Sequence, residues 1–123
     1  MKKALLILIA VIGFGFSANA QKICRISGAT DGSTIQVDYS HYDAATGYIY
    51  FSVSNDSQST TANFNFDFNV TFSNGAKSGT INKRGSGQAK PQYSDTLPVF
   101  VSEIKGGEVI EVKVTAVSST KCN

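Results

Sequence analysis

The chain holds few residues that could perform acid–base chemistry. His41 is its single histidine, and it lies between Asp38 and Asp43. A histidine beside carboxylates could act as a general base or bind a metal ion. No nucleophile or further ligand accompanies it in the pattern, and catalysis requires such a set in a defined geometry. We therefore expect a solvated histidine in a protein that is not an enzyme and has no cofactor and no metal site.

The two cysteines, Cys24 and Cys122, stand far apart in the chain. They lack the C-x-x-C spacing of redox centres, and two cysteines alone are too few ligands for a metal. In an oxidising compartment a disulfide between them is the default expectation, and only one intramolecular pairing exists. On the chain-entropy model, closing so long a loop stabilises a fold by about 4–5 kcal/mol.

Two further sets of residues suggest contact with a partner. Exposed tyrosines can stack on sugar rings or anchor protein interfaces, or they can simply pair across a sheet. The basic, glycine-rich stretch 82–95 lacks the order of a phosphate-binding loop, and it predicts a long loop that is either a flexible linker or a contact site. The candidate partner-binding residues are Tyr48, Tyr50, Lys83, Arg84, Lys90 and Tyr93.

The beginning of the chain predicts the cellular location of the protein. Lys2 and Lys3 precede an apolar run over 4–16, and a small-residue exit ends at Ala20. That order is typical of a secretory signal peptide cut after Ala20. A membrane anchor needs about 20 apolar residues, so this run is too short for one. A lipoprotein signal would place small residues before Cys24, and this chain does not.

Cleavage would remove residues 1–20 and leave 21–123 as a single domain without a membrane span. The removed segment contains two lysines and no acidic residue, so nine Lys or Arg remain against nine Asp or Glu. A formally neutral domain lacks the clustered basic excess of nucleic-acid-binding proteins. We expect an exported protein located in the periplasm, at the cell surface or in the medium, with no nucleic-acid partner.

Alternation of apolar and polar residues dominates the remaining chain and predicts β-strands. About seven short strands at regular spacing favour an all-β, antiparallel, immunoglobulin-like sandwich. Pro98 predicts an edge strand or a bulge. The expected strands cover 22–27, 34–39, 48–53, 62–72, 77–83, 97–101 and 110–116.

The strand over 62–72 has the clearest pattern. Its alternate apolar residues are Phe64, Phe66, Phe68, Val70 and Phe72. They predict one buried face and one wet face, with a hairpin turn at the Asn-Gly pair that follows. If such a strand were exposed at an edge it could drive self-association, whereas a covered central strand would not.

Three stretches resemble secreted bacterial immunoglobulin-like or fibronectin-III-like modules: Ile49–Asn55, Phe68–Gly75 and Ile104–Glu108. The exit of the signal, followed at once by Gln21, resembles exported proteins of Bacteroidota. The resemblance implies a non-catalytic module and carries over no functional residue. From the signal, the strand pattern and the missing catalytic set, we expect a module that binds a protein or glycan at the cell envelope. Two alternatives stay open: a self-associating subunit of an extracellular assembly or fibre, and a small secreted enzyme inhibitor that uses the stretch 82–95.

Overall fold

A computed structural model describes residues 22–26 and 29–119. The expected signal peptide and Cys122 lie outside the described residues. The elements in chain order are β1 (Lys22–Arg25), β2 (Thr34–Asp43), β3 (Tyr48–Asn55), β4 (Ala62–Asn74), β5 (Lys77–Ala89), β6 (Tyr93–Phe100), the 3-10 turn η1 (Ser102–Ile104) and β7 (Glu108–Ser119).

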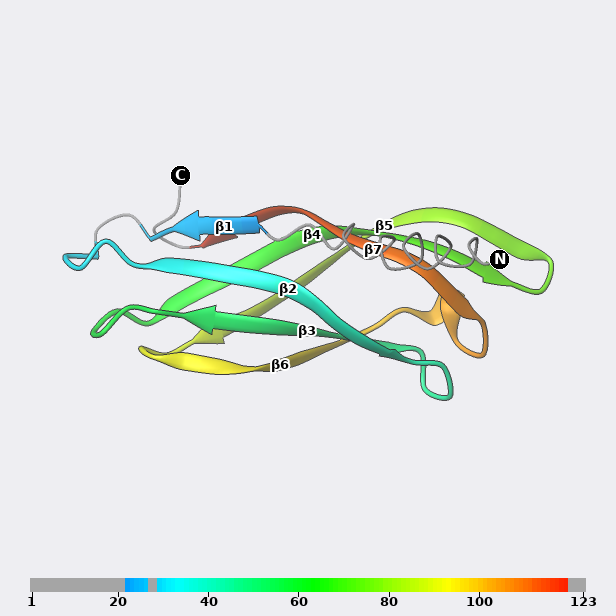
Figure 1. Ribbon diagram of the computed structural model, residues 1–123, viewed down its shortest axis with the longest axis horizontal. Helices are drawn as coiled ribbons and strands as arrows, with labels where there is room; N and C mark the ends of the chain where they lie inside the picture. The colour runs from blue at the N-terminus through cyan, green and yellow to red at the C-terminus, as the bar shows by residue number, and fades with distance from the viewer. Residues whose placement is uncertain (1–21, 27–28, 120–123) are drawn as a thin grey trace, which may run out of the picture.

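The strands form two antiparallel sheets, in the orders β1-β2-β3-β6 and β5-β4-β7. In Figure 1, β4 and β5 run diagonally past β2 and β3, and β1 lies beside the C-terminal end of β7. The all-β prediction with seven strands is confirmed. The immunoglobulin-like subclass is not: that fold pairs its first, second, fifth and fourth strands, whereas here the third strand pairs with the second and the sixth.

Phenylalanines from both sheets form the centre of the core. The ring of Phe51 on β3 lies 4.8 Å from the ring of Phe66 and 4.7 Å from that of Phe68, both on β4. All three side chains are buried. Edge-on and tilted contacts of this kind are the favoured arrangements of aromatic pairs, so they tie the two layers together.

The two faces of β4 match the prediction from alternation. Its apolar residues are buried from Phe64 to Phe72, and the residues between them face outward. The strand lies between β5 and β7, so both of its backbone edges are hydrogen-bonded within the sheet. Of the two arrangements that the sequence left open, β4 is therefore the covered central strand and not the exposed edge strand.

The predicted loop over 82–95 is wrong. Residues 82–89 belong to β5 and residues 93–95 to β6, so only 90–92 connect the two strands. The glycines that suggested flexibility lie opposite large rings, since Gly85 pairs with Phe66 and Gly87 with Phe64. A β-carbon built on Gly85 would lie 2.5 Å from the Phe66 ring. These glycines make room for core side chains and do not indicate a mobile loop.

Pro98 lies in β6, which pairs only with β3 and forms one edge of its sheet, as the sequence predicted. Proline lacks a backbone N–H and is tolerated at such an edge. None of the helical segments within residues 22–26 and 29–119 has the length and apolarity to span a membrane.

Candidate functional site

The outer face of the four-stranded sheet carries an ordered grid of side chains. Its members occupy alternate positions on β2, β3 and β6, on the side opposite the buried residues. Each rung contains one residue from each strand, and the rungs are Asp43–Tyr48–Phe100, His41–Tyr50–Pro98, Asp38–Ser52–Thr96 and Gln36–Ser54–Ser94.

The grid divides into two halves of different chemistry. We call His41, Tyr48, Tyr50, Pro98 and Phe100 the aromatic patch. We call Gln36, Asp38, Ser52, Ser54, Ser94 and Thr96 the polar half. Rings thus occupy one end of the face, together with the carboxyl of Asp43, the twelfth member of the grid, and hydroxyl, amide and carboxyl groups occupy the other end.

A β-bulge in β2 brings His41 into the aromatic patch. Tyr39 pairs with Phe51 and His41 with Tyr50, so Ser40 is the extra residue of the bulge. Bulges of this kind change the direction in which side chains point. Here the bulge places His41 on the outer face, and it places Tyr42 inward, where the Tyr42 hydroxyl donates to the backbone oxygens of Ile104 and Gly107 at 2.6 and 3.0 Å.

The rings of the patch contact one another in a chain. His41 stacks on Tyr50 with 4.5 Å between ring centroids and 9° between planes. Tyr50 lies 6.2 Å from Tyr48, and Tyr48 lies 5.5 Å from Phe100. The Oγ of Ser40 and the Nδ1 of His41 form a hydrogen bond of 3.0 Å, which orients the imidazole. The solvated histidine that the sequence predicted is exposed, but it is part of an aromatic stack.

The patch leaves apolar surface in contact with water. Phe100 is 51% exposed and Tyr48 is 36% exposed. Among the described residues, only Ile23 and Ile110 are other large hydrophobic side chains with comparable exposure. Burial of apolar surface stabilises proteins, so clustered exposed rings with a polar surround are typical of binding surfaces.

The polar half contains one carboxyl with an altered environment. Burial against the sheet raises the pKa of Asp38, and a hydrogen bond with the Gln36 side chain acts in the opposite direction. Near neutral pH this carboxyl is an acceptor of hydrogen bonds. Its neighbours on the same rung, Ser52 and Thr96, each carry a hydroxyl that can donate or accept.

The structure does not bring the six predicted partner-binding residues together. Tyr48 and Tyr50 lie in the aromatic patch. Lys83 lies at an inward position on β5, and its Nζ forms an ion pair of 3.0 Å with Glu103. Lys90 and Tyr93 flank the short β5–β6 connection, where the Tyr93 N–H donates to the Lys90 oxygen, and the Tyr93 ring packs partly against the core.

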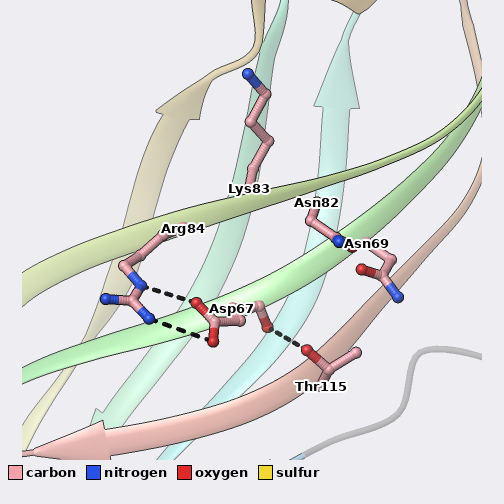
Figure 2. Close-up of a pocket in the computed structure, with 6 residues that line it drawn as sticks. All are labelled: Asp67, Asn69, Asn82, Lys83, Arg84 and Thr115. Atoms are coloured by element: carbon pink, nitrogen blue, oxygen red, sulfur yellow. Dashed lines mark hydrogen bonds and ion pairs between the residues drawn. The ribbon is translucent and has the colours of Figure 1, made fainter.

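Arg84 lies on the outer face of the other sheet, in a pocket of about 460 Å³. Its Nε donates to Asp67 Oδ1 at 2.8 Å, and this hydrogen bond lowers the pKa of the Asp67 carboxyl. Figure 2 shows the guanidinium turned toward Asp67 while Lys83 extends away from both. Lys83, Asn69, Asn82 and Thr115 complete the lining. The charged groups of this pocket already have partners, since Arg84 pairs with Asp67 and Lys83 pairs with Glu103 outside the pocket.

Pro98 and Phe100 are functional candidates that sequence reasoning missed. Both occupy outward positions of a strand that was recognised only by its inward residues, Leu97, Val99 and Val101. Their spacing of two residues, beside the tyrosine pair of another strand, was the available signal. The role of His41 was missed because strict alternation does not reveal a bulge.

Within the residues that the structure describes, no group of three or more His, Cys, Asp or Glu side chains could hold a metal ion. Cys24 is buried, and its Sγ lies 4.0 Å from the Oγ of Ser119 near the end of β7. The disulfide with Cys122 stays a prediction because Cys122 lies outside the described residues.

Comparison with protein-family models, curated proteins and solved structures finds no match to this chain. The function is therefore argued from the geometry of the site.

Proposed function

We propose that this protein is an exported, non-catalytic β-sandwich module that binds a protein or glycan partner at the cell envelope through the aromatic patch. The observation that carries the proposal is the exposure of Tyr48 and Phe100 in one connected cluster of rings. Export is supported by the composition of residues 1–20. The proposal does not include an immunoglobulin-like subclass, because the strand pairing differs from that fold.

The two alternative functions have less support. An assembly driven by strand 62–72 needs a free edge on that strand, and β4 is covered on both sides. An inhibitor that inserts the stretch 82–95 into an enzyme needs a loop there, and the stretch forms β5 and the start of β6. Strand 62–72 therefore no longer favours an assembly, and the stretch 82–95 no longer favours an inhibitor.

The test uses the mature chain, residues 21–123, immobilised and exposed to envelope extract from the cells that produce it. The variant Tyr48→Ser/Phe100→Ser removes two exposed rings, so it should fold normally. The matched control Asn69→Ser/Asn82→Ser changes two exposed side chains on the opposite sheet. Mass spectrometry measures the proteins and glycans retained.

We expect the wild type and the control to retain the same component and the ring variant to lose it by about tenfold or more, as truncation of aromatic anchors does in other interfaces. Equal retention by all three proteins would disprove a role for the aromatic patch. Recovery of only the protein itself would instead support the assembly function.

A further inference from the structure

We infer that the ligand of this outer face is a neutral saccharide, with the aromatic patch stacking against its sugar rings and the polar half bonding its hydroxyls. The inference rests on the proposed binding function and names the class of ligand.

The rings offer a surface that suits pyranose units. A pyranose with equatorial hydroxyls has two faces made of axial C–H bonds, which carry small positive partial charges. Aromatic faces carry the complementary negative charge of the ring quadrupole. Tyr48 and Tyr50 follow each other along β3 with 6.2 Å between ring centroids and 46° between planes, and Phe100 on β6 is tilted by 58° from Tyr48, so a sugar unit would stack on one ring and contact the edges of the next.

The surface is organised before any ligand arrives. His41 covers one side of Tyr50 in a nearly parallel stack, and the Ser40 hydroxyl holds the imidazole in place. Pro98, which has no rotatable side chain, pairs with Tyr50 from β6 in the same rung. Side chains that are already ordered lose less entropy on binding, which matters for weakly held ligands such as sugars.

The polar half supplies hydrogen-bonding groups next to the rings. Ser52 and Thr96 stand one rung beyond Tyr50 and Pro98, and same-face neighbours on a strand are about 6.6 Å apart. A saccharide that lies along β3 would thus place one unit on rings and the next on hydroxyls. Sugars present this combination of apolar faces and hydroxyl edges.

The charges of the grid favour an uncharged ligand. Its twelve positions include the carboxyls of Asp38 and Asp43 and no lysine or arginine. Like charges repel, so acidic sugars such as uronates are disfavoured on this face. The Asp43 carboxylate already accepts hydrogen bonds from Ala45 and Thr46 in the adjoining turn, which leaves Asp38 as the carboxyl available to sugar hydroxyls.

The limited apolar area favours a saccharide over a protein partner. A stable protein interface buries about 800 Å² on each partner around a dry, apolar core. Here the exposed Tyr48 and Phe100 lie at one end of the face and the exposed Ile23 of β1 lies beside Gln36 at the other, with rows of serine and threonine between them, so the dry centre of such an interface would be small. A narrow ligand that stacks on a few rings fits this face better.

The test titrates the ¹⁵N-labelled mature chain with three hexasaccharides: cellohexaose and xylohexaose, which are neutral with equatorial hydroxyls, and hexagalacturonate, which is acidic. We expect both neutral probes to shift resonances of β3 and β6 and the acidic probe to bind more weakly. Tyr50→Ser should weaken binding about tenfold, while Tyr50→Phe, which keeps the ring, should preserve it. Thr80→Ser on the opposite sheet serves as a control that leaves binding unchanged.

Three results would overturn the inference: unchanged resonances with both neutral probes, tighter binding of hexagalacturonate, or shifts confined to β4, β5 and β7. The extract experiment separates this failure from failure of the proposed function. If a protein is retained through the patch while the neutral sugars do not bind, the binding function stands and the ligand class is wrong. If neither binds through the patch, both are wrong.

Discussion

Gly85 suggests a flexible loop in the sequence, but in the structure the packing of a neighbouring ring requires a glycine at this position. It faces inward on β5 beneath the ring of Phe66, and an added β-carbon would lie 2.5–2.7 Å from ring atoms and 3.1 Å from Val99. Phe66 is fully buried between the layers, so its ring has little room to move.

We therefore predict that Gly85→Ala destabilises the protein. Replacing glycine in a strand stabilises by about 0.4–1 kcal/mol through the unfolded chain, whereas overpacking a core costs about 1–3 kcal/mol, so the collision should dominate. Urea denaturation measures the change in the free energy of unfolding. Ser86→Ala, on the exposed side of the same strand, is the control and should change it little. A Gly85→Ala variant as stable as the wild type would show that the ring moves freely.

The residue types predicted the inward faces of the strands well, but they did not predict the surroundings of Gly85, Gly87 and His41. The buried phenylalanines of β4 were recognisable because alternation over many residues leaves one consistent register. Gly85 and Gly87 suggested a loop because the phenylalanine rings that pack over them belong to β4. The local sequence of β5 does not show that pairing. His41 was predicted as a solvated residue since the partner of its stack, Tyr50, is brought beside it by strand pairing.

At the scale of the element, β5 and β6, two of the four edge strands of the described sheets, carry features that discourage strand addition. Exposed edges offer unpaired backbone groups to other chains, and proteins guard them with proline and with inward-pointing charges. β6 contains Pro98. β5 places Lys83 at an inward position opposite Phe68, where its Nζ reaches Glu103.

We predict that Lys83→Val increases self-association. The substitution removes the inward charge and leaves a long strand with an apolar inner row at the edge of its sheet. Analytical ultracentrifugation over a range of concentrations measures the effect. Arg84→Gln removes the same charge from the outward side of β5 and should leave the protein in its original association state. If both variants behave alike, net charge rather than the inward position controls association.

The elements themselves were mostly predictable. The starts of β3 and β4 and the hairpin after Asn74 follow from alternation and the Asn-Gly pair, and Gly75 has the positive φ of 60° that this turn requires. The pairing of β3 with β6 was not predictable, because contacts between strands distant in sequence leave no local signal. The grid of the candidate site depends on that pairing, so its tyrosines could be predicted from the sequence, but its proline and phenylalanine could not.

At the scale of the whole molecule, the first and the last described strands, β1 and β7, contact each other. Cys24 on β1 lies against the end of β7, with its Sγ 4.0 Å from Ser119, three residues before Cys122 in the sequence. We predict that the exported protein has a mass two hydrogens below the reduced form. We also predict that Cys24→Ser/Cys122→Ser lowers the free energy of unfolding by about 4–5 kcal/mol. Free thiols in freshly exported protein would contradict the bridge.

The protein should lose stability in acid. Hydrogen bonds lower the pKa of three carboxyls: those from Ser33 and Gln58 to Asp31, from Arg84 to Asp67, and from Lys83 to Glu103. A carboxyl whose pKa is lower in the folded state stabilises the fold above its unfolded pKa, and this contribution disappears as the pH falls through the folded value. Burial raises the pKa of Asp38, which acts in the opposite direction and is a single group against three.

We therefore expect the free energy of unfolding to stay nearly constant from neutral pH to about pH 5 and to decrease below about pH 4, near the unfolded pKa values of Asp and Glu. Urea denaturation at a series of pH values measures this. Asp67→Asn removes one of the three groups and should flatten the acid decrease, whereas Asp95→Asn is a control on an exposed carboxyl. Stability that rises in acid would indicate that Asp38 dominates.

The extra residue makes β2 tolerant of a change of length at one point. Ser40 stands outside the alternation, so deleting it would leave His41 directly after Tyr39, and the regular pleat would still turn the imidazole outward and the Tyr42 ring inward. The deletion would remove the hydrogen bond between Ser40 and His41, so the imidazole would keep its face of the sheet and lose the contact that orients it.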